Sequence, residues 1–428
     1  MKIAFVGTGY LGTTTAACLA ELGHVVVGID VDAKKIASLS QGIVPFHEPG
    51  LPELVQKHLA SGALRFTTSL DDAIPGAQVV FIGVGTPDSG TGQPDMSYVE
   101  SSARAVAERI SEYTVIAIKS TVPVGTNERI REIVSATTAI PFDIVSNPEF
   151  LAEGRAVRDT LEPTRTLIGS TSVKAIELMK QVYASVSGPV MVMDPASVEL
   201  AKYASNAFLA TKVSFINEIS HICEESGADV HNVAIAMSAD PRIGKEFLRA
   251  GPGWGGGCFP KDVRGLLHMG KSYGLPMHVV LAAHDANQHA RERVADRIHA
   301  LLAGPSRIAL LGLSFKANTD DTRDSPAIGM AHRLVSFGHE VIAYDPVARI
   351  ATEYARERFE HREDPYEAAT GAHAVVIATE WSQFKEIDFA RLRSVMAGDL
   401  FVDTRNIVDP EKVRSAGFRY ARIGTSNQ

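Results

Sequence analysis

The segment that most constrains the fold lies at the N-terminus, where a short apolar run leads into a glycine-rich turn. Residues 3–6 have the pattern of a buried strand, and GTGYLG follows at 7–12. An alanine-rich helical pattern and a second apolar strand at 24–29 come next, and Asp30 ends that strand 18 residues after the last glycine. Strand, GxGxxG turn, helix, strand and terminal acid together are typical of the dinucleotide-binding (Rossmann) fold.

The same segment predicts a cofactor. Glycines let a pyrophosphate approach the helix N-terminus, whose unpaired N–H groups and dipole favour anions. Asp30 would accept hydrogen bonds from an adenosine ribose and repel a 2′-phosphate, which favours NAD over NADP. Lys34 and Lys35 follow closely. Phosphate binding by these two lysines is therefore the alternative.

Three further apolar runs have the pattern of strands buried on both faces of a parallel sheet. They cover residues 79–84, 115–118 and 142–145. Because ligands in such folds bind beyond the carboxyl ends of the strands, we expect Thr86, Thr121 and Glu149 to line one crevice. Each of them, taken singly, fits equally well as a turn or capping residue.

A long helix is predicted to begin at Asp-Pro, residues 194–195, with no strong helix breaker before Gly227. Its length would be about 48 Å, and such a rod normally bridges domains or pairs with a partner subunit. Lys202 and Asn206 stand four residues apart on one face of it. Spacing alone favours a solvated face with an ion pair between Glu199 and Lys202.

The most glycine-dense stretch of the chain, GPGWGGGCFPKD at 251–262, contains Cys258. Glycine allows close approach of the backbone to a ligand, whereas a cysteine used for packing belongs on an apolar helix or strand face. Cys18 and Cys223 lie in helical patterns and are predicted to be packed thiols. The Cys258 loop is therefore predicted to belong to a functional site.

A second strand–helix–strand unit begins near Arg307 and lacks the full glycine fingerprint, so we expect it to bind a different phosphorylated ligand. Its apolar runs cover 308–311, 340–344, 374–378 and 400–402. Lys316, Arg323 and Arg405 follow strand ends and are the candidate anion contacts; the alternative for each is a surface cation.

Length and composition fit this reading. The 428 residues are 45% hydrophobic and 21% charged, with a net charge of −8, which gives no sign of nucleic-acid binding. Apolar runs are too short for a membrane span, and no signal-peptide layout is present. Three dispersed cysteines argue against a disulfide framework and a zinc site. We expect a cytoplasmic enzyme without a metal.

The predicted fold class is α/β, with two Rossmann-like, doubly wound parallel-sheet domains joined by a long central helix. The predicted domains are an NAD-binding domain at 1–193, a helical connector and dimerisation domain at 194–300, and a nucleotide-binding domain at 301–428.

Seven motifs in order resemble the UDP-glucose 6-dehydrogenases, within the UDP-glucose/GDP-mannose dehydrogenase family. They are GTGYLG, KSTVPVGT, NPEFLAEG, ELAKYASNAF, DPRIGKEFL, GPGWGGGCFPKD and FKANTDDTRDSPA. The resemblance implies oxidation of a sugar C6 hydroxymethyl to a carboxylate with two NAD in turn, giving UDP-glucuronate. A thiolate would add to the intermediate aldehyde, and a thioester would then be hydrolysed.

The resemblance also implies roles for individual residues. Cys258 would be the nucleophile, Lys202 and Asn206 would stabilise the oxyanion, Asp262 would orient a water, and Thr121 and Glu149 would assist hydrolysis. The implied NAD contacts are Gly7, Gly9, Tyr10, Leu11, Gly12, Asp30, Lys35, Thr86, Thr121, Glu153, Lys261 and Arg323. The implied UDP-sugar contacts are Glu149, Phe150, Leu151, Glu153, Lys202, Asn206, Arg242, Phe247, Leu248, Gly255, Phe259, Lys316 and Arg405.

Three further implications follow from the resemblance. Lys202 or Lys261 would favour the thiolate of Cys258. Arg242 would reach a neighbouring subunit's site, so a homodimer or a multiple of dimers is implied. Gly257 stands where relatives often have serine, which removes a hydroxyl and loosens the loop.

Several alternatives stay open at this point. A relative acting on GDP-mannose or a UDP-N-acetylhexosamine would share the catalytic residues. A non-catalytic NAD-binding protein would not need Cys258, Lys202, Asn206 and Asp262 together, and a 6-phosphogluconate-type dehydrogenase would lack the nucleophilic cysteine.

Overall fold

The computed structural model describes residues 1–88, 90–349 and 359–426. The chain divides into two compact units. Unit 1 comprises Met1–Ser205 and Arg264–Met269, and unit 2 comprises Asn206–Val263 and Gly270–Gln428. The division into three domains that the sequence predicts differs from this division into two units and stays a prediction.

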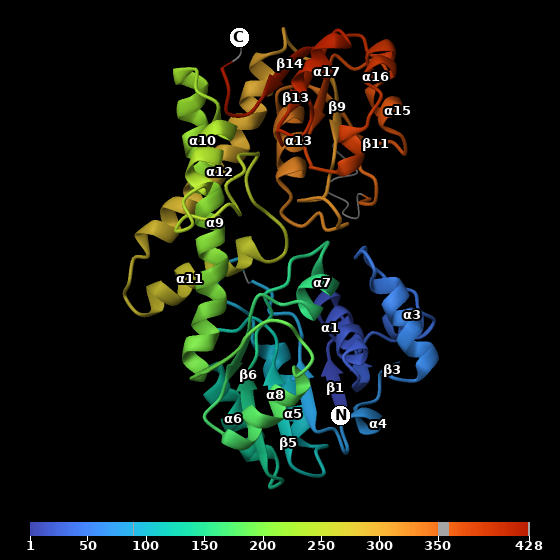
Figure 1. The fold of residues 1–428 in the computed structure, drawn as a ribbon, viewed down its shortest axis with the longest axis vertical. Helices are drawn as coiled ribbons and strands as arrows, with labels where there is room; N and C mark the ends of the chain where they lie inside the picture. Colours follow the sequence, from blue (N-terminus) through green and yellow to red (C-terminus); the bar gives the residue numbers. More distant parts are fainter. Residues whose placement is uncertain (89, 350–358, 427–428) are drawn as a thin grey trace. The chain divides into compact units, whose positions relative to one another are not determined.

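Unit 1 contains an eight-stranded sheet in the order β3-β2-β1-β4-β5-β6-β7-β8 (Figure 1). Its strands are β1 (Lys2–Val6), β2 (Val25–Ile29), β3 (Leu64–Thr67), β4 (Val79–Ile82), β5 (Thr114–Ile118), β6 (Phe142–Ser146), β7 (Thr166–Gly169) and β8 (Val190–Met193). All neighbouring strands are parallel except β6 and β7, which pair antiparallel at Ser146 and Gly169. The structure therefore confirms the strands that the sequence predicts at 3–6, 24–29, 79–84, 115–118 and 142–145.

Helices cover both faces of this sheet, as the alternation of buried side chains requires. Ile3 and Phe5 of β1 belong to one hydrophobic cluster, with residues of α1 and α3, whereas Ala4 and Val6 belong to another, with residues of α5 and α6. The helices of unit 1 are α1 (Tyr10–Glu21), α2 (Ala33–Ser40), α3 (Leu51–Ser61), α4 (Leu70–Ala73), α5 (Ser97–Ala107), α6 (Thr126–Thr137), α7 (Ala156–Leu161) and α8 (Val173–Val182).

Unit 2 contains a six-stranded, fully parallel sheet in the order β11-β10-β9-β12-β13-β14. Its strands are β9 (Arg307–Leu311), β10 (Glu340–Tyr344), β11 (Glu360–His361), β12 (Ala374–Ile377), β13 (Leu400–Asp403) and β14 (Arg419–Arg422). Strand order repeats that of the first six strands of unit 1. The second Rossmann-like unit predicted from the sequence is thereby confirmed.

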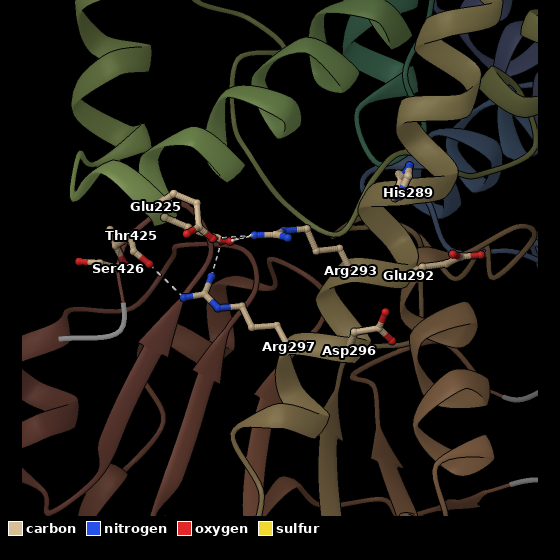
Figure 2. A pocket seen from close by; sticks show the side chains of 9 residues that line it. Glu225, His289, Glu292, Arg293, Asp296, Arg297, Thr425 and Ser426 are labelled. Atoms are coloured by element: carbon tan, nitrogen blue, oxygen red, sulfur yellow. Dashed lines mark hydrogen bonds and ion pairs between the residues drawn. The ribbon is translucent and has the colours of Figure 1, made fainter.

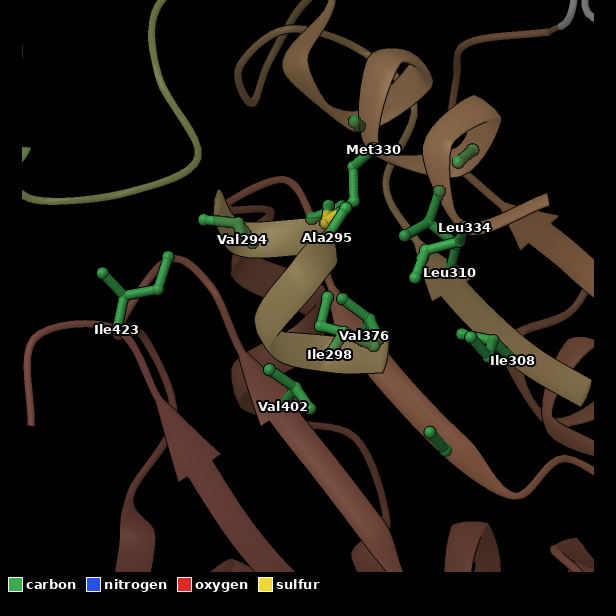
Figure 3. Close-up of a cluster of buried hydrophobic side chains, with 14 of the residues drawn as sticks. Val294, Ala295, Ile298, Ile308, Leu310, Met330, Leu334, Val376, Val402 and Ile423 are labelled. Atoms are coloured by element: carbon green, nitrogen blue, oxygen red, sulfur yellow. The ribbon is translucent and has the colours of Figure 1, made fainter. Parts of the chain in front are cut away.

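The helices of unit 2 pack on both faces of this second sheet. They are α10 (Val230–Ser238), α12 (His278–Ala300), α13 (Pro326–Ser336), α15 (Pro365–Ala369), the 3₁₀ turn η1 (Ser382–Lys385), α16 (Phe389–Val395) and α17 (Pro410–Ser415). In Figure 3, Val294 and Ile298 of α12 and Met330 of α13 meet Leu310 of β9 in one buried cluster. Ala309 and Leu311, which point to the other face, pack with residues of α15 and α16.

The long helix α9 (Pro195–Ser226) has 32 residues, as predicted, and α11 (Phe259–Ser272) has 14. Both helices contribute residues to both units. Lys202 and Asn206 lie one turn apart on α9, on either side of the division between units.

Candidate active site

The GTGYLG turn joins β1 to α1 and can be built only with glycine at two positions. Gly7 has a φ of +95°, and a Cβ there would lie 2.9 Å from the carbonyl oxygen of Gly83. A Cβ on Gly12 would lie 1.7 Å from the carbonyl oxygen of Gly7. The N-cap residue of α1 is Gly9, so the N-terminus of this helix has no side-chain cap. The turn therefore fits an anionic ligand such as a pyrophosphate.

Asp30, at the end of β2, is held by the turn and by a neighbouring lysine. Its Oδ2 accepts hydrogen bonds from Thr8 N at 2.9 Å and Thr8 Oγ1 at 3.1 Å. Lys35 Nζ lies 2.9 Å from the same oxygen. Burial acts to raise the pKa of Asp30, but hydrogen bonds from Asp32 N, Lys35 and Thr8 hold it below the usual value. Lys35 is thus a partner of the acid rather than an isolated phosphate-binding cation.

The Tyr10 side chain points to Glu48, a buried acid that the sequence analysis did not identify. The Tyr10 hydroxyl donates a hydrogen bond to Glu48 Oε2, and Glu48 also accepts from Gly154 N and Ala156 N, both at 2.7 Å. Glu48 therefore links the glycine-rich turn to the segment that carries Glu153. No local pattern marks it, because its partners lie far apart in the sequence.

Two predicted residues beyond the strand ends meet directly. Thr86 Oγ1 donates a hydrogen bond to the carbonyl oxygen of Thr121 at 3.0 Å. Thr86 is buried, and Thr121 is half-buried. The loops after β4 and β5 are thus joined by a predicted pair, as expected for adjacent parallel strands.

Lys202 of α9 pairs with Glu149, which follows β6. Lys202 Nζ lies 2.7 Å from Glu149 Oε1, and the two side chains are 4% and 11% exposed. Glu149 Oε2 accepts a hydrogen bond from Leu151 N at 2.6 Å, and the Phe150 ring centroid lies 5.3 Å from Lys202 Nζ. Half-buried Glu153 follows in the same segment.

The prediction of an ion pair between Glu199 and Lys202, which rested on their spacing, is wrong. Glu199 is buried and accepts hydrogen bonds from Gly125 N and Asn127 N at 2.8 Å and from Ser146 Oγ at 3.1 Å. Burial raises the pKa of Glu199. Glu199 accepts hydrogen bonds from the backbone N–H groups at the start of α6 instead of pairing with Lys202, because that helix has no side-chain cap of its own.

In unit 2, the loop before α11 is glycine-rich because other segments pack against its backbone. A Cβ on Gly255 would lie 2.1 Å from the carbonyl oxygen of Asp324, and Gly256 has a φ of +85°. The three atoms nearest to a Cβ on Gly257 would all belong to the guanidinium of Arg323, the nearest at 2.4 Å. Gly257 therefore leaves room for the Arg323 side chain.

Cys258 ends this loop and is exposed, whereas Cys18 and Cys223 are buried as predicted. The carbonyl oxygen of Cys258 accepts a hydrogen bond from Asp262 N at 2.9 Å, so the thiol lies at the start of α11. The N-terminal end of a helix favours negative charge. This position favours a negatively charged sulfur.

Asp262 is buried between two predicted residues. Its Oδ2 accepts a hydrogen bond from Asn206 Nδ2 at 2.6 Å, and its Oδ1 lies 2.5 Å from Lys261 Nζ. Unit 2 therefore brings Asn206, Cys258, Lys261 and Asp262 to the start of α11.

The flanking aromatic residues also gather here. Phe247 has a φ of +63°, and the centroid of its ring lies 6.0 Å from that of Phe259. Leu248 is buried. Arg242 is highly exposed and pairs with Asp240 at 2.5 Å, and it contacts none of the predicted site residues of its own chain in the described region.

The three candidate anion contacts differ in burial. Arg405 is 13% exposed, and its Nη2 donates to the carbonyl oxygen of Phe315 at 3.1 Å, next to half-buried Lys316. A Cβ on Gly251 would lie 3.6 Å from Arg405 Nη1, so the glycine-rich loop lies against this arginine. Arg323 is exposed and pairs with Asp321 at 2.7 Å.

One pocket in unit 2 is lined by other residues. Its volume is about 430 Å³, and its charged side chains come from α9 and α12, including Glu224, Arg293 and Arg297 (Figure 2). None of the sequence-predicted site residues lines it. Within the described residues, no group of three or more His, Cys, Asp or Glu is arranged to hold a metal, and no helix is long and apolar enough to cross a membrane.

Comparison with known proteins agrees with this geometry. Three domains of the UDP-glucose/GDP-mannose dehydrogenase family match the chain: the NAD binding domain at residues 1–187, the central domain at 196–289 and the UDP binding domain at 309–410. The UDP-glucose 6-dehydrogenase of Rhizobium meliloti (strain 1021) is 44% identical, over 99% of both chains. UDP-glucose 6-dehydrogenase TuaD of Bacillus subtilis (strain 168) is 41% identical, over 99% of this chain and 93% of the relative.

Solved structures give the same result. A UDP-glucose dehydrogenase from Pyrobaculum islandicum superposes with a TM-score of 0.90 at 36% identity, covering 99% of this chain and 97% of the other. A UDP-D-ManNAc dehydrogenase from Pyrococcus horikoshii gives 0.88 at 29% identity, covering 100% of both chains. With NAD binding and central domains matched and homologous dehydrogenases along its whole length, the chain is an NAD-dependent oxidoreductase that belongs to the UDP-glucose/GDP-mannose dehydrogenase family.

Proposed function

We propose that this protein oxidises the C6 hydroxymethyl of UDP-glucose to the carboxylate of UDP-glucuronate, through a cysteine-bound intermediate. One observation carries the proposal: Cys258 is the exposed thiol, at the start of a helix and beside a buried Asp262 that Asn206 orients. A cysteine used for packing would be buried, as Cys18 and Cys223 are.

The NAD site fits the residues of unit 1. Gly7 to Gly12 leave the backbone open to a pyrophosphate, and Asp30 stands at the strand end where a ribose would be recognised. Thr86, Thr121, Glu153, Lys261 and Arg323 are the further proposed contacts. NAD bound there would supply the hydride acceptor, with a separate NAD for each of the two oxidations at C6.

The residues of the chain have three tasks in this scheme. The Cys258 sulfur would add to the aldehyde carbon, because a bare aldehyde does not readily lose a hydride. Lys202 and Asn206 would stabilise the negative oxygen of the adduct. After the second oxidation a water, oriented by Asp262 and assisted by Thr121 and Glu149, would cleave the thioester, with the carboxylate leaving as product and the thiol restored.

The UDP group is assigned to unit 2, on the strength of the family's UDP binding domain. Lys316 and Arg405 follow strand ends there. The loop from Phe247 to Gly255 lies against Arg405, and Phe247 of this loop lies near Phe259. Lys316→Ala should weaken UDP-sugar binding and leave NAD binding nearly intact in a calorimetric titration. Loss of NAD binding with unchanged UDP-sugar binding would reject this assignment.

The substrate test is absorbance of NADH with a panel of nucleotide sugars. UDP-glucose should give the highest kcat/KM, above GDP-mannose and UDP-N-acetylhexosamines. The likeness to a UDP-D-ManNAc dehydrogenase makes the N-acetyl sugars the second candidate. Absence of NADH formation with every nucleotide sugar would favour a non-catalytic NAD-binding protein and contradict the proposal.

The long helix α9 also supports the proposed homodimer. Phe208, Phe215 and Ile222 recur every seven residues on it and are 66%, 46% and 62% exposed. A seven-residue repeat places these side chains in one stripe along the helix, and such a stripe is suited to pairing with the same stripe of a second copy. Exposed Arg242 is proposed to reach the site of that second copy.

The oligomeric state tests this surface. The native protein should sediment as a dimer or a multiple of dimers, and Phe215→Glu combined with Ile222→Glu should release monomers. Val173→Glu, at a position on α8 that is 75% exposed, is the matched control and should leave the assembly unchanged. A native monomer, or equal dissociation by the control, would contradict the proposed dimer face.

A further inference from the structure

A buried lysine, Lys119, lies directly after β5 and has no role in the scheme above. Lys119 is 7% exposed. Its Nζ donates hydrogen bonds to Asn147 Oδ1 at 3.1 Å and to the Tyr183 hydroxyl at 3.2 Å. Tyr183, whose hydroxyl donates to the same Asn147 oxygen at 2.6 Å, completes a closed triangle. The ammonium thus has neutral hydrogen-bond partners.

The triangle connects the two strands whose following loops carry proposed site residues. Lys119 stands two residues before Thr121, and Asn147 stands two residues before Glu149. Strands β5 and β6 pair in parallel, with Ile118 opposite Ser146. A hydrogen bond from Lys119 to Asn147 therefore fixes the two loops relative to each other where the paired strands end.

The charge of Lys119 is unusual for so buried a side chain. Burial lowers the pKa of Lys119 to about 8, and Lys202 also lowers it while Glu149 raises it. The titratable groups around Lys119 are Tyr183 directly after α8, Glu149 after β6 and Lys202 of α9. A buried cation without a carboxylate partner is unfavourable. Lys119 is such a cation, and the charges of Glu149 and Lys202 act on it.

We propose that Lys119 is a positioning residue for the oxidation: it holds the loops of Thr121 and Glu149 in register and places a positive charge next to the Glu149–Lys202 pair. This inference rests on the proposed roles of Glu149 and Lys202. A nearby positive charge lowers the pKa of both a carboxyl group and an ammonium group. Removing the charge of Lys119 should therefore displace the ionisations on which turnover depends toward higher pH.

The test compares two variants that alter the same triangle. Lys119→Met removes the charge and keeps the chain length, whereas Tyr183→Phe removes one hydroxyl and keeps the charge. With NAD and UDP-glucose saturating, we expect both limbs of the kcat–pH profile to move to higher pH in Lys119→Met. In Tyr183→Phe the profile should keep its limbs, with at most a lower plateau.

Three outcomes are decisive. Unmoved limbs in Lys119→Met, or the same displacement in both variants, would overturn the inference, because a structural role alone predicts either. Lys119→Gln gives the same comparison if Lys119→Met does not fold. Glu149→Gln in the same assay separates the two levels: if it retains native turnover, the proposed function of Glu149 fails, whereas an impaired Glu149→Gln with an unmoved Lys119→Met profile rejects only the role of Lys119.

Discussion

Lys202 Nζ and Glu149 Oε1 lie 2.7 Å apart, and both side chains are almost fully buried. Removing two charges from water is unfavourable, so a buried ion pair stabilises the fold only while both partners are present and charged. The pair also joins the beginning of α9 to the segment after β6.

The first prediction concerns the stability of that pair. Lys202→Met and Glu149→Gln should each lower the free energy of unfolding by about 3–5 kcal/mol, because each leaves an unpaired buried charge or dipole. The double variant should lose clearly less than the sum of the two. Urea unfolding of the four proteins measures this coupling, and strict additivity would show that the two side chains do not depend on each other.

The second prediction concerns the choice of cofactor. Asp30→Asn should raise the ratio of NADP to NAD use, because the repulsion of a 2′-phosphate is removed. Lys35→Met, which removes only the ion-pair partner, should leave NAD preferred. Steady-state kinetics with both cofactors measures the ratio. Efficient use of NADP by the native protein would mean that Lys34 or Lys35 binds phosphate and that the role of Asp30 is wrong.

The third prediction separates two neighbouring glycines. Gly255→Ala should destabilise the protein by about 1–3 kcal/mol, since the new Cβ would meet the backbone oxygen of Asp324 at 2.1 Å. Gly257→Ser should change stability by less than about 1 kcal/mol, because the nearest atoms belong to the exposed Arg323 side chain, which can move. Thermal unfolding compares them. Equal Tm losses would show that the loop packs differently.

The fourth prediction concerns acid pH. His339 Nδ1 accepts from Ser306 N at 3.1 Å, so its Nε2 donates to His299 Nδ1 at 2.9 Å, and the His339 ring is neutral in this arrangement. Burial and nearby His299 lower the pKa of His339 below 6.5. The unfolded chain therefore binds the extra proton more readily, and this contribution to stability is present above pH 6.5 and lost as the pH falls.

The measurement is the free energy of unfolding at pH 7.5 and pH 5.5. Between these two conditions the native protein should lose more stability than His339→Asn. His278→Asn, at an exposed position at the start of α12, is the control and should behave as the native protein does. A native protein and a His339→Asn variant with the same pH dependence would assign the acid sensitivity to other groups.

Local sequence patterns predicted most of the framework. Apolar periodicity, the GTGYLG turn and the Asp-Pro helix start identified β1, α1, β2 and the 32-residue α9. These features depend on residues close in sequence, where propensity, capping and periodicity act directly. The strand order of both sheets then follows from the Rossmann pattern, except for the antiparallel pairing of β6 and β7.

Contacts between distant residues could not be read from the sequence. Glu48 binds Gly154 N, and Glu199 binds Gly125 N, although each pair is separated by many residues. Spacing on α9 suggested a Glu199–Lys202 pair. In the structure Glu199 instead accepts from the N–H groups at the start of α6, and Lys202 pairs with Glu149 after β6. Buried polar pairing is decided by which segments the folded chain brings together, and a one-dimensional pattern does not contain that information.

The measurement that tests the central claim most directly is the number of NADH molecules formed for each UDP-glucose consumed. The native enzyme should form two, and mass spectrometry of a quenched reaction should find the sugar nucleotide on the peptide that carries Cys258. Cys258→Ser should lose turnover by roughly a thousandfold, since a hydroxyl is a poorer nucleophile and leaving group. Cys258→Ala should still form aldehyde slowly, because Lys202 and the NAD site remain. One NADH per sugar in the native enzyme, or full conversion to the acid by Cys258→Ala, would contradict a covalent role for this cysteine.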